Sequence, residues 1–332
     1  MIAYDYSRIE TIIIEPQLGT LRLMRDTLAR LGMKRLQGFT SLAELPKLLE
    51  SSAPDLIMAD ADSPDSDLFK IIRWLRNDPM AANPFPCVIV STWTPTAALV
   101  ARASTCGADD MLIKPASQRQ VQERIVNLIE NRRKFVVTAD YIGPDRRKAQ
   151  RDGKGGGAPL IDAPNTLRLK AAGQWDKINA RDLIVMGKAR VHEQKLIRIG
   201  VQLAFLIEYA LPDYQTTTPG HIAADHVARM PALIEDLLRR LDESEVERAV
   251  GEAARALKVA VLTLQTSIGG EEHAAYAQQV RELAFELMAT IEPARAKEAL
   301  IQEVDAVVAN YRQHLARLAA AKQAGEAVPG PA

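Results

Sequence analysis

The stretch DLIMAD, residues 55–60, decides the fold, because four apolar residues lead directly into a carboxylate. Three other stretches have the same form, namely IIIEP at 12–16, PCVIVST at 86–92 and DDMLIKP at 109–115. Continuous apolar runs of this length are typical of buried parallel strands. The carboxyl ends of such strands meet at one edge of the sheet, where open α/β sheets bind ligands. The polar residues that the pattern places at this edge are Glu15, Asp60, Ser91 and Lys114.

Five strand–helix units follow one another along the first part of the chain. Strands are expected at 11–14, 35–39, 55–59, 86–90 and 110–113. Amphipathic helices are expected at about 18–31, 41–51, 67–77, 95–105 and 118–133. This alternation predicts an α/β domain over residues 1–134, with a doubly wound, five-stranded parallel sheet that helices cover on both faces.

The remainder of the chain has a different pattern. Residues 135–177 contain several glycines and prolines, which disfavour regular structure, and are expected to form a flexible basic linker. Apolar residues at helical spacing then predict a separate all-α helical bundle domain over 178–322. Its first helix is expected at about 178–211, ending before Pro212. A disordered tail is expected at 323–332.

The overall composition excludes several classes of protein. The 42 Lys and Arg residues balance 42 Asp and Glu residues among 332, so the chain has no bias toward nucleic acid or anionic membranes. No apolar run reaches the roughly 18–20 residues that span a bilayer, and the N-terminus does not have the form of a secretory signal. Two cysteines are too few for a disulfide framework. We therefore expect a cytoplasmic protein with no membrane partner and no specific nucleic-acid partner.

Residues 11 to about 133 resemble the receiver domain of two-component response regulators. Glu15 precedes Asp60 by 45 residues, Ser91 follows after 31, and Lys114 after a further 23. Proline also follows Asp60 four residues later, at Pro64, and the pair Lys114-Pro115 is typical of this family. The resemblance implies a flavodoxin-like fold and a cis Lys114–Pro115 peptide bond. The helical domain resembles no family in the same way.

The resemblance also implies a phosphoryl-transfer chemistry. Asp60 would be the phosphoryl acceptor, with Ser91 and Lys114 contacting the transferred phosphate. Mg²⁺ would be held by Glu15, Asp60 and residue Asp62, through its backbone carbonyl or its side chain. The residues implied for the switch region are Thr92, Met111 and Pro115. The phosphate source would be a histidine kinase or a phosphotransfer protein.

Three departures from the family pattern make the acidic pocket atypical. Pro16 replaces the second of two adjacent acids, so the residue that usually binds the metal directly is missing. Met111 replaces the usual aromatic residue of the switch, and Leu68 replaces a usual glycine. We hypothesise that the Asp62 carboxylate partly restores metal binding, although it could instead repel phosphate.

The expected linker contains a cluster of basic residues. Arg146, Arg147 and Arg151 follow Tyr141 and a Gly-Pro pair, an arrangement that could bind a phosphorylated nucleotide. Some motility-related receiver proteins carry an arginine-rich extension that binds cyclic di-GMP, and this segment is similar. The alternative is a solvated helix end and tether, in which residues 132–134 complement a helix C-terminus.

The helical domain identifies no chemistry by its sequence. His192 and Lys195 have the spacing of a phosphotransfer helix, but Leu196 stands where such helices usually have a small residue, which favours an ordinary helix-surface or boundary histidine. His221 and His226 are five residues apart, which does not place two zinc ligands on one helical face. We expect an unknown protein partner, or a homodimer along 178–211, which could equally be a core helix.

Taken together, the sequence predicts an atypical response regulator in a phosphorelay, without enzymatic activity beyond accepting a phosphoryl group. Phosphorylation of Asp60 would control the protein contacts of the helical domain. One alternative is a pseudo-receiver scaffold that works without phosphorylation. The other is a regulator that senses cyclic di-GMP through the basic linker.

Overall fold

The structure is a computed structural model that describes residues 4–63, 67–147, 159–216, 219–267, 270 and 272–323. Side chains 319 and 321–323 are outside this description, as is the expected tail from residue 324. The chain divides into two compact units. The first comprises Met1–Arg146 and Pro159–Val191, and the second comprises Arg147–Ala158 and His192–Ala332.

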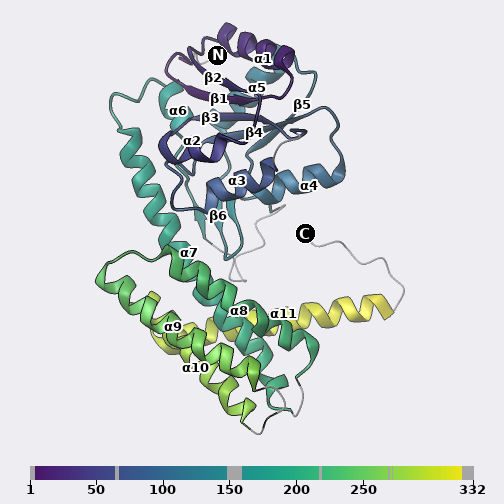
Figure 1. Cartoon of the computed structure of the whole chain (residues 1–332), viewed down its shortest axis with the longest axis vertical. Coiled ribbons are helices and arrows are strands. Elements are labelled where there is room, and N and C mark those ends of the chain that lie inside the picture. The colour runs from purple at the N-terminus through teal and green to yellow at the C-terminus, as the bar shows by residue number, and fades with distance from the viewer. Residues whose placement is uncertain are drawn as a thin grey trace. The chain divides into compact units, whose positions relative to one another are not determined.

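The first unit contains the predicted five-stranded parallel sheet (Figure 1). Its strands are β1 (Glu10–Ile14), β2 (Arg35–Phe39), β3 (Leu56–Asp60), β4 (Cys87–Thr92) and β5 (Asp110–Ile113). They run in the order β2-β1-β3-β4-β5, which is the flavodoxin-like order. The helices between and after them are α1 (Leu18–Arg30), α2 (Leu45–Ser51), α3 (Leu68–Asn77), α4 (Ala97–Cys106) and α5 (Gln118–Glu130). The predicted fold class of this domain is therefore confirmed.

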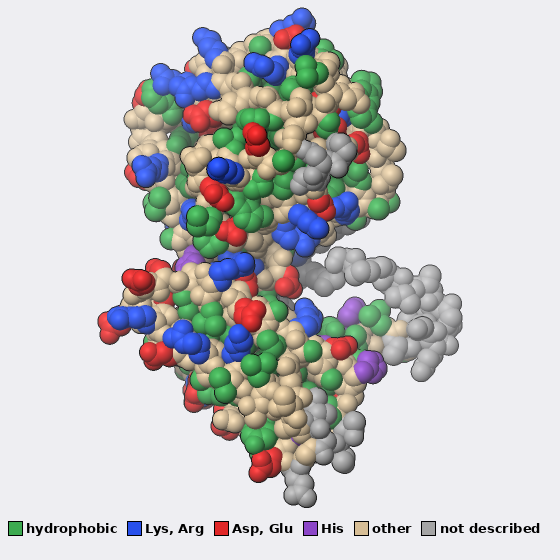
Figure 2. Space-filling model, viewed as in Figure 1, with side chains coloured by type: hydrophobic (Ala, Val, Ile, Leu, Met, Phe, Trp, Pro, Cys, Tyr) green, Lys and Arg blue, Asp and Glu red, His purple; other side chains and the backbone are tan. Residues whose placement is uncertain are grey.

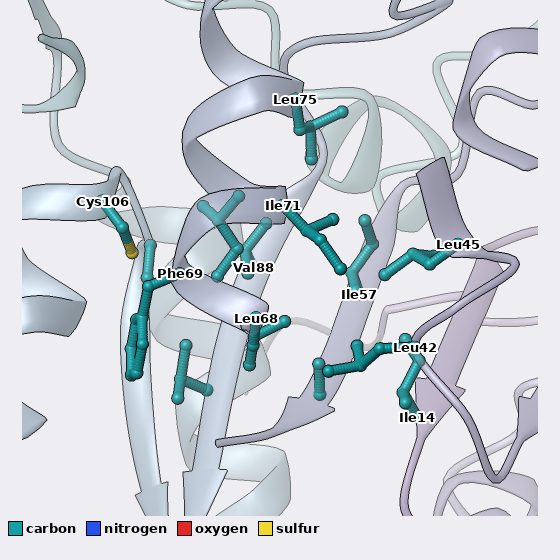
Figure 3. Close-up of a cluster of buried hydrophobic side chains, with 14 of the residues drawn as sticks. Ile14, Leu42, Leu45, Ile57, Leu68, Phe69, Ile71, Leu75, Val88 and Cys106 are labelled. Carbon is teal, nitrogen blue, oxygen red and sulfur yellow. The ribbon is translucent and has the colours of Figure 1, made fainter. Parts of the chain in front are cut away.

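Both faces of the sheet are buried, which explains why its central strands are apolar throughout. Ile12 and Ile14 of β1 pack on the face that α2, α3 and α4 cover, whereas Ile13 packs on the opposite face with α1 and α5. Strands β3 and β4 alternate between the two faces in the same way. Figure 3 shows Ile14, Ile57 and other members of the first cluster. This packing holds the strand ends, and therefore the residues that follow them, in fixed positions.

Much of the segment expected to be a flexible linker instead forms strands and a helix that pack within the first unit. Residues 135–177 contain β6 (Phe135–Val137), β7 (Ile142–Pro144), β8 (Leu160–Ile161) and α6 (Thr166–Ala171). The strands form a small antiparallel sheet, ordered β7-β6-β8. The apolar side chains of β6 and β7 and that of Ile161 in β8 are buried, which stabilises strands too short to produce a recognisable sequence pattern. Most of the glycines on which the linker prediction depended lie at 153–157, outside the described residues.

A buried group of ionic residues joins this small sheet to the receiver-like core. Asp109 accepts hydrogen bonds from Arg76 Nη2 and from Arg132 Nε, each at 2.8 Å. The Arg76 side chain is 0% exposed, that of Arg132 is 5% exposed and that of Asp109 is 2% exposed. The guanidinium groups of Arg76 and Arg132 lie 5.1 and 5.0 Å from the ring centre of Phe135 in β6. The expectation that Arg132 is a solvated residue at a helix end is therefore wrong, because the residue is buried beside Asp109.

The second unit is helical, as predicted. Its helices are α8 (His221–Arg240), α9 (Glu245–Thr266), α10 (His273–Ile291) and α11 (Lys297–Gln323), with α7 (Ala180–Tyr214) beginning in the first unit. Helix α9 packs against α8 and α10, and α10 packs against α11 (Figure 1). Helix α7 continues through Pro212, so the expected end before this proline is wrong. The helix ends two residues later, so the proline removes hydrogen bonding only from its last turn.

The buried face of α7 decides between two uses expected for this helix. Ile199, Leu203, Leu206 and Ile207 are 0% exposed within the single chain. They therefore belong to the core of the helical unit, and this face of α7 is not available as a dimer interface. The homodimer itself stays a prediction.

The surface shows no large field of one charge on the face drawn in Figure 2, where basic and acidic side chains intermingle over the described residues. This agrees with the net charge of zero. Among the described residues, no helix combines the length and the apolar character that crossing a membrane requires.

Candidate functional site

Three charged side chains meet at the carboxyl edge of the parallel sheet. Glu15 follows β1, Asp60 ends β3 and Lys114 follows β5. The Lys114 ammonium donates to Glu15 Oε2 at 2.7 Å and to Asp60 Oδ2 at 2.8 Å. The three residues are only 3–4% exposed. The structure therefore brings together charges that are as many as 99 positions apart in the chain.

Ser91 lies beside Asp60 on the neighbouring strand. The two residues are partners in the parallel register of β3 and β4, and the backbone carbonyl of Ser91 accepts from the amide of Ala61 at 2.8 Å. Ser91 is 5% exposed. The fourth residue that the sequence assigned to this edge is thus next to the predicted acceptor.

The two carboxylates share one cation and also accept backbone hydrogen bonds. The amide of Gln17 donates to Glu15 Oε1 at 3.2 Å, and the amide of Asp62 donates to Asp60 Oδ1 at 3.3 Å. Charges buried to this extent are stable only when they are paired and hydrogen-bonded. Because two carboxylates face one ammonium, the site still offers negative charge to an incoming cation.

The side chain of Asp62 has a different environment from the one expected of a metal ligand. Its Oδ2 atom accepts from Thr92 Oγ1 at 3.1 Å and from the backbone amide of Trp93 at 3.3 Å. It thus joins the loop after β3 to the end of β4 and the loop that follows. We call this pair of hydrogen bonds the Asp62 clasp.

Trp93 is a residue of the site that the sequence analysis did not select. The Lys114 ammonium lies 5.0 Å from the centre of its ring, within the range of a cation–π interaction. Trp93 is 43% exposed, so it lies between the buried ion pair and solvent. The available signal was an aromatic residue two positions after Ser91 in a polar loop, which by itself names no function.

The residues fit a Mg²⁺ ion in chemistry, though with few protein ligands. Glu15 and Asp60 supply the hard oxygens that this ion prefers, and Mg²⁺ usually keeps several waters. Among the described residues, no three His, Cys, Asp or Glu side chains gather as a ready-made metal site. Pro16 contributes no side-chain ligand, and Lys114 occupies one oxygen of each carboxylate.

The predicted switch residues occupy separate environments. Thr92 is fully buried, and its hydroxyl accepts from the amide of Thr94 in addition to its bond with Asp62. Met111 is partly buried and packs on the apolar core. The Lys114–Pro115 peptide bond is cis, as the resemblance implied, and Pro115 is exposed. Pro64 lies outside the described residues.

The structure describes two of the three arginines predicted to bind a nucleotide. Arg146 Nη2 donates to the carbonyl oxygens of Ala108 at 2.6 Å and Asp109 at 3.4 Å, so this side chain contacts the core of its own unit. Arg147 is exposed, and Arg151 lies outside the described residues.

Tyr141, the aromatic residue beside these arginines, has a structural contact. Its ring hydroxyl donates to the carbonyl of Pro144 at 3.0 Å, and burial raises the pKa of this hydroxyl to about 12. The tyrosine side chain is thus bonded to the end of β7 and contributes a contact to the small sheet.

His192 and His226 of the helical unit have protein partners, whereas His221 is exposed. His192 Nε2 lies 2.7 Å from Glu247 Oε1, while Lys195 is 2% exposed. His226 Nδ1 lies 2.7 Å from the carbonyl oxygen of Ile222, on its own helix. These contacts explain both histidines as parts of the bundle.

Comparison with known proteins points to one family for the first domain. The family model for the response regulator receiver domain matches residues 11–126. The probable chemotaxis protein CheY of Rhizobium etli is 25% identical over 118 residues, which are 36% of this chain and 90% of that protein.

Two solved structures are each similar to somewhat more than a third of the chain. A receiver domain protein from Methanospirillum hungatei is 18% identical, with a TM-score of 0.33, over 36% of this chain and 92% of that one. The signal receiver domain of a DNA-binding response regulator from Colwellia psychrerythraea is 24% identical, with a TM-score of 0.33, over 37% of this chain and 99% of that one.

Proposed function

Because residues 11–126 form a response regulator receiver domain, we propose that this chain is an atypical response regulator in which Asp60 accepts a phosphoryl group. The observation that supports this role is the shared ammonium of Lys114, which is within hydrogen-bonding distance of both Asp60 and Glu15. A carboxylate at a strand end, beside a cation and a hydroxyl, is what an aspartyl phosphate requires.

The proposed reaction uses the groups of the receiver, a phosphoryl donor and a divalent cation. An oxygen of Asp60 attacks the phosphorus atom, forming the acyl phosphate bond as the bond between phosphorus and the donor atom breaks. The donor leaves with that electron pair, and a phosphohistidine of a kinase or phosphotransfer protein is such a donor. Mg²⁺ near Glu15 and Asp60 would neutralise phosphate charge. Lys114 then exchanges a carboxylate partner for a phosphoryl oxygen, while Ser91 supplies a hydroxyl donor.

The helical unit is proposed to carry the output through protein contacts. Phosphorylation converts the single negative charge of Asp60 to about two at the sheet edge, and this added charge and its acceptor oxygens can bias a two-state surface. No other reaction is proposed for the chain, and its partner is expected to be a protein that meets the helical unit.

Intact-mass measurement tests the acceptor directly. The wild-type chain is incubated with acetyl phosphate and Mg²⁺, and its mass is compared with that of Asp60→Asn treated in parallel. The proposal expects one added phosphoryl group in the wild type and none in the variant. A mass unchanged by treatment in both proteins would contradict it.

The shortage of acidic residues favours a second candidate, a receiver that binds its partner without phosphorylation. Only Glu15 and Asp60 supply carboxylates to Lys114 among the described residues, and Pro16 replaces the second acid. In that case the Lys114 ion pair serves only to hold the loops together. Unchanged partner capture by Asp60→Asn in a pull-down would favour this candidate, whereas phosphorylation-dependent capture would favour the first.

A further inference from the structure

The predicted acceptor is closed to solvent, although a phosphoryl donor must reach it. The side chains of Asp60 and Glu15 are 4% and 5% exposed, and that of Lys114 is 2% exposed. A nucleophile must come close to the phosphorus atom in line with the leaving group. The closed arrangement therefore has to open, at least transiently, before Asp60 can react.

Among the described residues, the loop after β4 contacts the charged group through an exposed side chain. It carries Trp93, an exposed residue whose ring centre lies 5.0 Å from the Lys114 ammonium. The same ammonium also contacts the carboxylates of Glu15 and Asp60. Displacing the ring would uncover the ammonium that contacts the acceptor carboxylate.

The Asp62 clasp holds that loop in place. One carboxylate oxygen receives both the hydroxyl hydrogen of Thr92 and the amide hydrogen of Trp93. The Thr92 hydroxyl accepts in turn from the amide of Thr94, which fixes the next residue of the loop. Hydrogen bonds to an ionised carboxylate are stronger than neutral ones, so these contacts favour the closed loop.

We propose that Asp62 and Trp93 form a gate over Asp60, in which the Asp62 clasp keeps the Trp93 ring over Lys114 and limits access of the phosphoryl donor. Asp62 acts as a positioning residue through Trp93. This inference rests on the proposed function for its consequence in phosphoryl transfer, whereas the gate itself is a property of the free protein.

The clasp and metal binding compete for the same carboxylate. An Asp62 carboxylate that binds a cation can no longer accept fully from Thr92 and Trp93. By linkage, a cation at Asp62 favours the open loop, and an open loop favours the cation. The receiver would thereby couple metal binding to access, in a domain where Met111 replaces the usual aromatic switch residue.

Acrylamide quenching of Trp93 fluorescence tests the gate without any phosphoryl donor. The experiment uses the full chain with Trp74→Phe and Trp175→Phe, which leaves Trp93 as the only tryptophan. Thr92→Val removes the hydroxyl and preserves side-chain shape, and Thr92→Ser is the matched control that restores it. Loss of one hydrogen bond to a charged group shifts such an equilibrium by about 12- to 150-fold. We expect stronger quenching in Thr92→Val than in the parent, and parent-like quenching in Thr92→Ser.

A second variant keeps the test decisive if Thr92→Val does not fold. Asp62 is exposed, so Asp62→Ala removes the whole clasp without opening a cavity in the core. It should increase quenching at least as much as Thr92→Val. Quenching that equals the parent value in Asp62→Ala would overturn the gate.

The rate of phosphorylation by acetyl phosphate is the second readout. Thr92→Val should be phosphorylated about 12- to 150-fold faster than the parent, and Thr92→Ser at the parent rate. Increased quenching with an unchanged nonzero rate would overturn the role of the gate in access. Increased quenching with no phosphorylation of any variant would instead contradict the proposed function and leave the gate supported.

Discussion

Lys114 Nζ lies 2.8 Å from Asp60 Oδ2, although 54 positions separate the two residues in the chain. The same ammonium is shared with Glu15. The packing of β1, β3 and β5 in one parallel sheet produces this relationship, because it places all three strand ends at the same edge. The ion pair is therefore a consequence of the parallel sheet, and it lies at the centre of the candidate site.

Replacing Lys114 by Met should strongly destabilise the first unit. The variant leaves two carboxylates buried without their cation, and removal of one partner from a buried pair typically costs about 3–5 kcal/mol. Urea denaturation followed by tryptophan fluorescence measures this unit alone, because Trp74, Trp93 and Trp175 all belong to it.

An exposed ion pair of the same unit provides the control for Lys114→Met. Arg119 and Glu123 pair on the surface of α5, with side chains that are 86% and 58% exposed. Arg119→Met should therefore cost only about 0–1 kcal/mol. A loss for Lys114→Met no larger than that of Arg119→Met would contradict the buried ion pair.

Asp109 should be more important for stability than its neighbour Asp110. Asp109→Asn removes the charge that compensates two buried guanidinium groups, so we expect a loss of about 3–5 kcal/mol. Asp110 pairs with the half-exposed Arg124, and Asp110→Asn should cost about 0–1 kcal/mol. The same fluorescence-detected denaturation compares them. Similar losses in the two variants would show that the buried group does not join β6 to the core as described.

Gly143 should not tolerate alanine. A Cβ atom there would lie 2.5 Å from Tyr141 Oη and 2.8 Å from the Cα of Gly107, which itself has a φ of +99°. Overpacking of this kind costs about 1–3 kcal/mol. Gly19→Ala is the matched control, because its Cβ meets nothing within 4 Å and alanine favours helix α1. Thermal unfolding should therefore show a lower midpoint for Gly143→Ala and an equal or higher midpoint for Gly19→Ala.

His273 should make the helical unit less stable at high pH. Its ring nitrogens lie 2.6 Å from the carbonyl oxygen of Gly270 and 2.7 Å from that of Thr216, and both carbonyls can only accept. These contacts, the Gly270 carbonyl first, raise the pKa of His273 above its ordinary 6.5. The stabilisation is fully present below pH 6.5, the value for the unfolded chain, and is lost as the pH rises through the raised value.

Circular dichroism at two pH values checks the role of His273. Between about pH 6 and about pH 8.5, the thermal midpoint of the helical unit should fall in the wild type more than in His273→Gln, which has no titratable ring. An identical pH response of the two proteins would contradict the assignment of a protonated His273.

The sequence predicted the parallel sheet because each central strand is buried on both faces. Ile12, Ile13 and Ile14 are all apolar for this reason, and continuous apolar runs are a strong signal. The meeting of Glu15, Asp60 and Lys114 was also predictable, since parallel strand ends share an edge whatever the loops do. Their roles in phosphoryl transfer stay predictions.

The contacts of the expected linker could not be predicted from local pattern. Strands β6 and β7 are three residues long, which is too short for a period to appear, and Gly143-Pro144 has the composition of a turn. Arg132 is buried only because Asp109 and Phe135 surround it, and these contacts are tertiary. Trp93 has the same difficulty, since its position over Lys114 depends on two loops that meet in space.

The central claim is that Asp60 is the phosphoryl acceptor, and mapping of the modified residue tests it most directly. The chain is treated with acetyl phosphate and Mg²⁺, reduced with borohydride, which converts an aspartyl phosphate to homoserine, and sequenced by mass spectrometry. We predict homoserine at position 60 and at no other aspartate. Homoserine at position 62 instead, or at no position after treatment, would contradict the account.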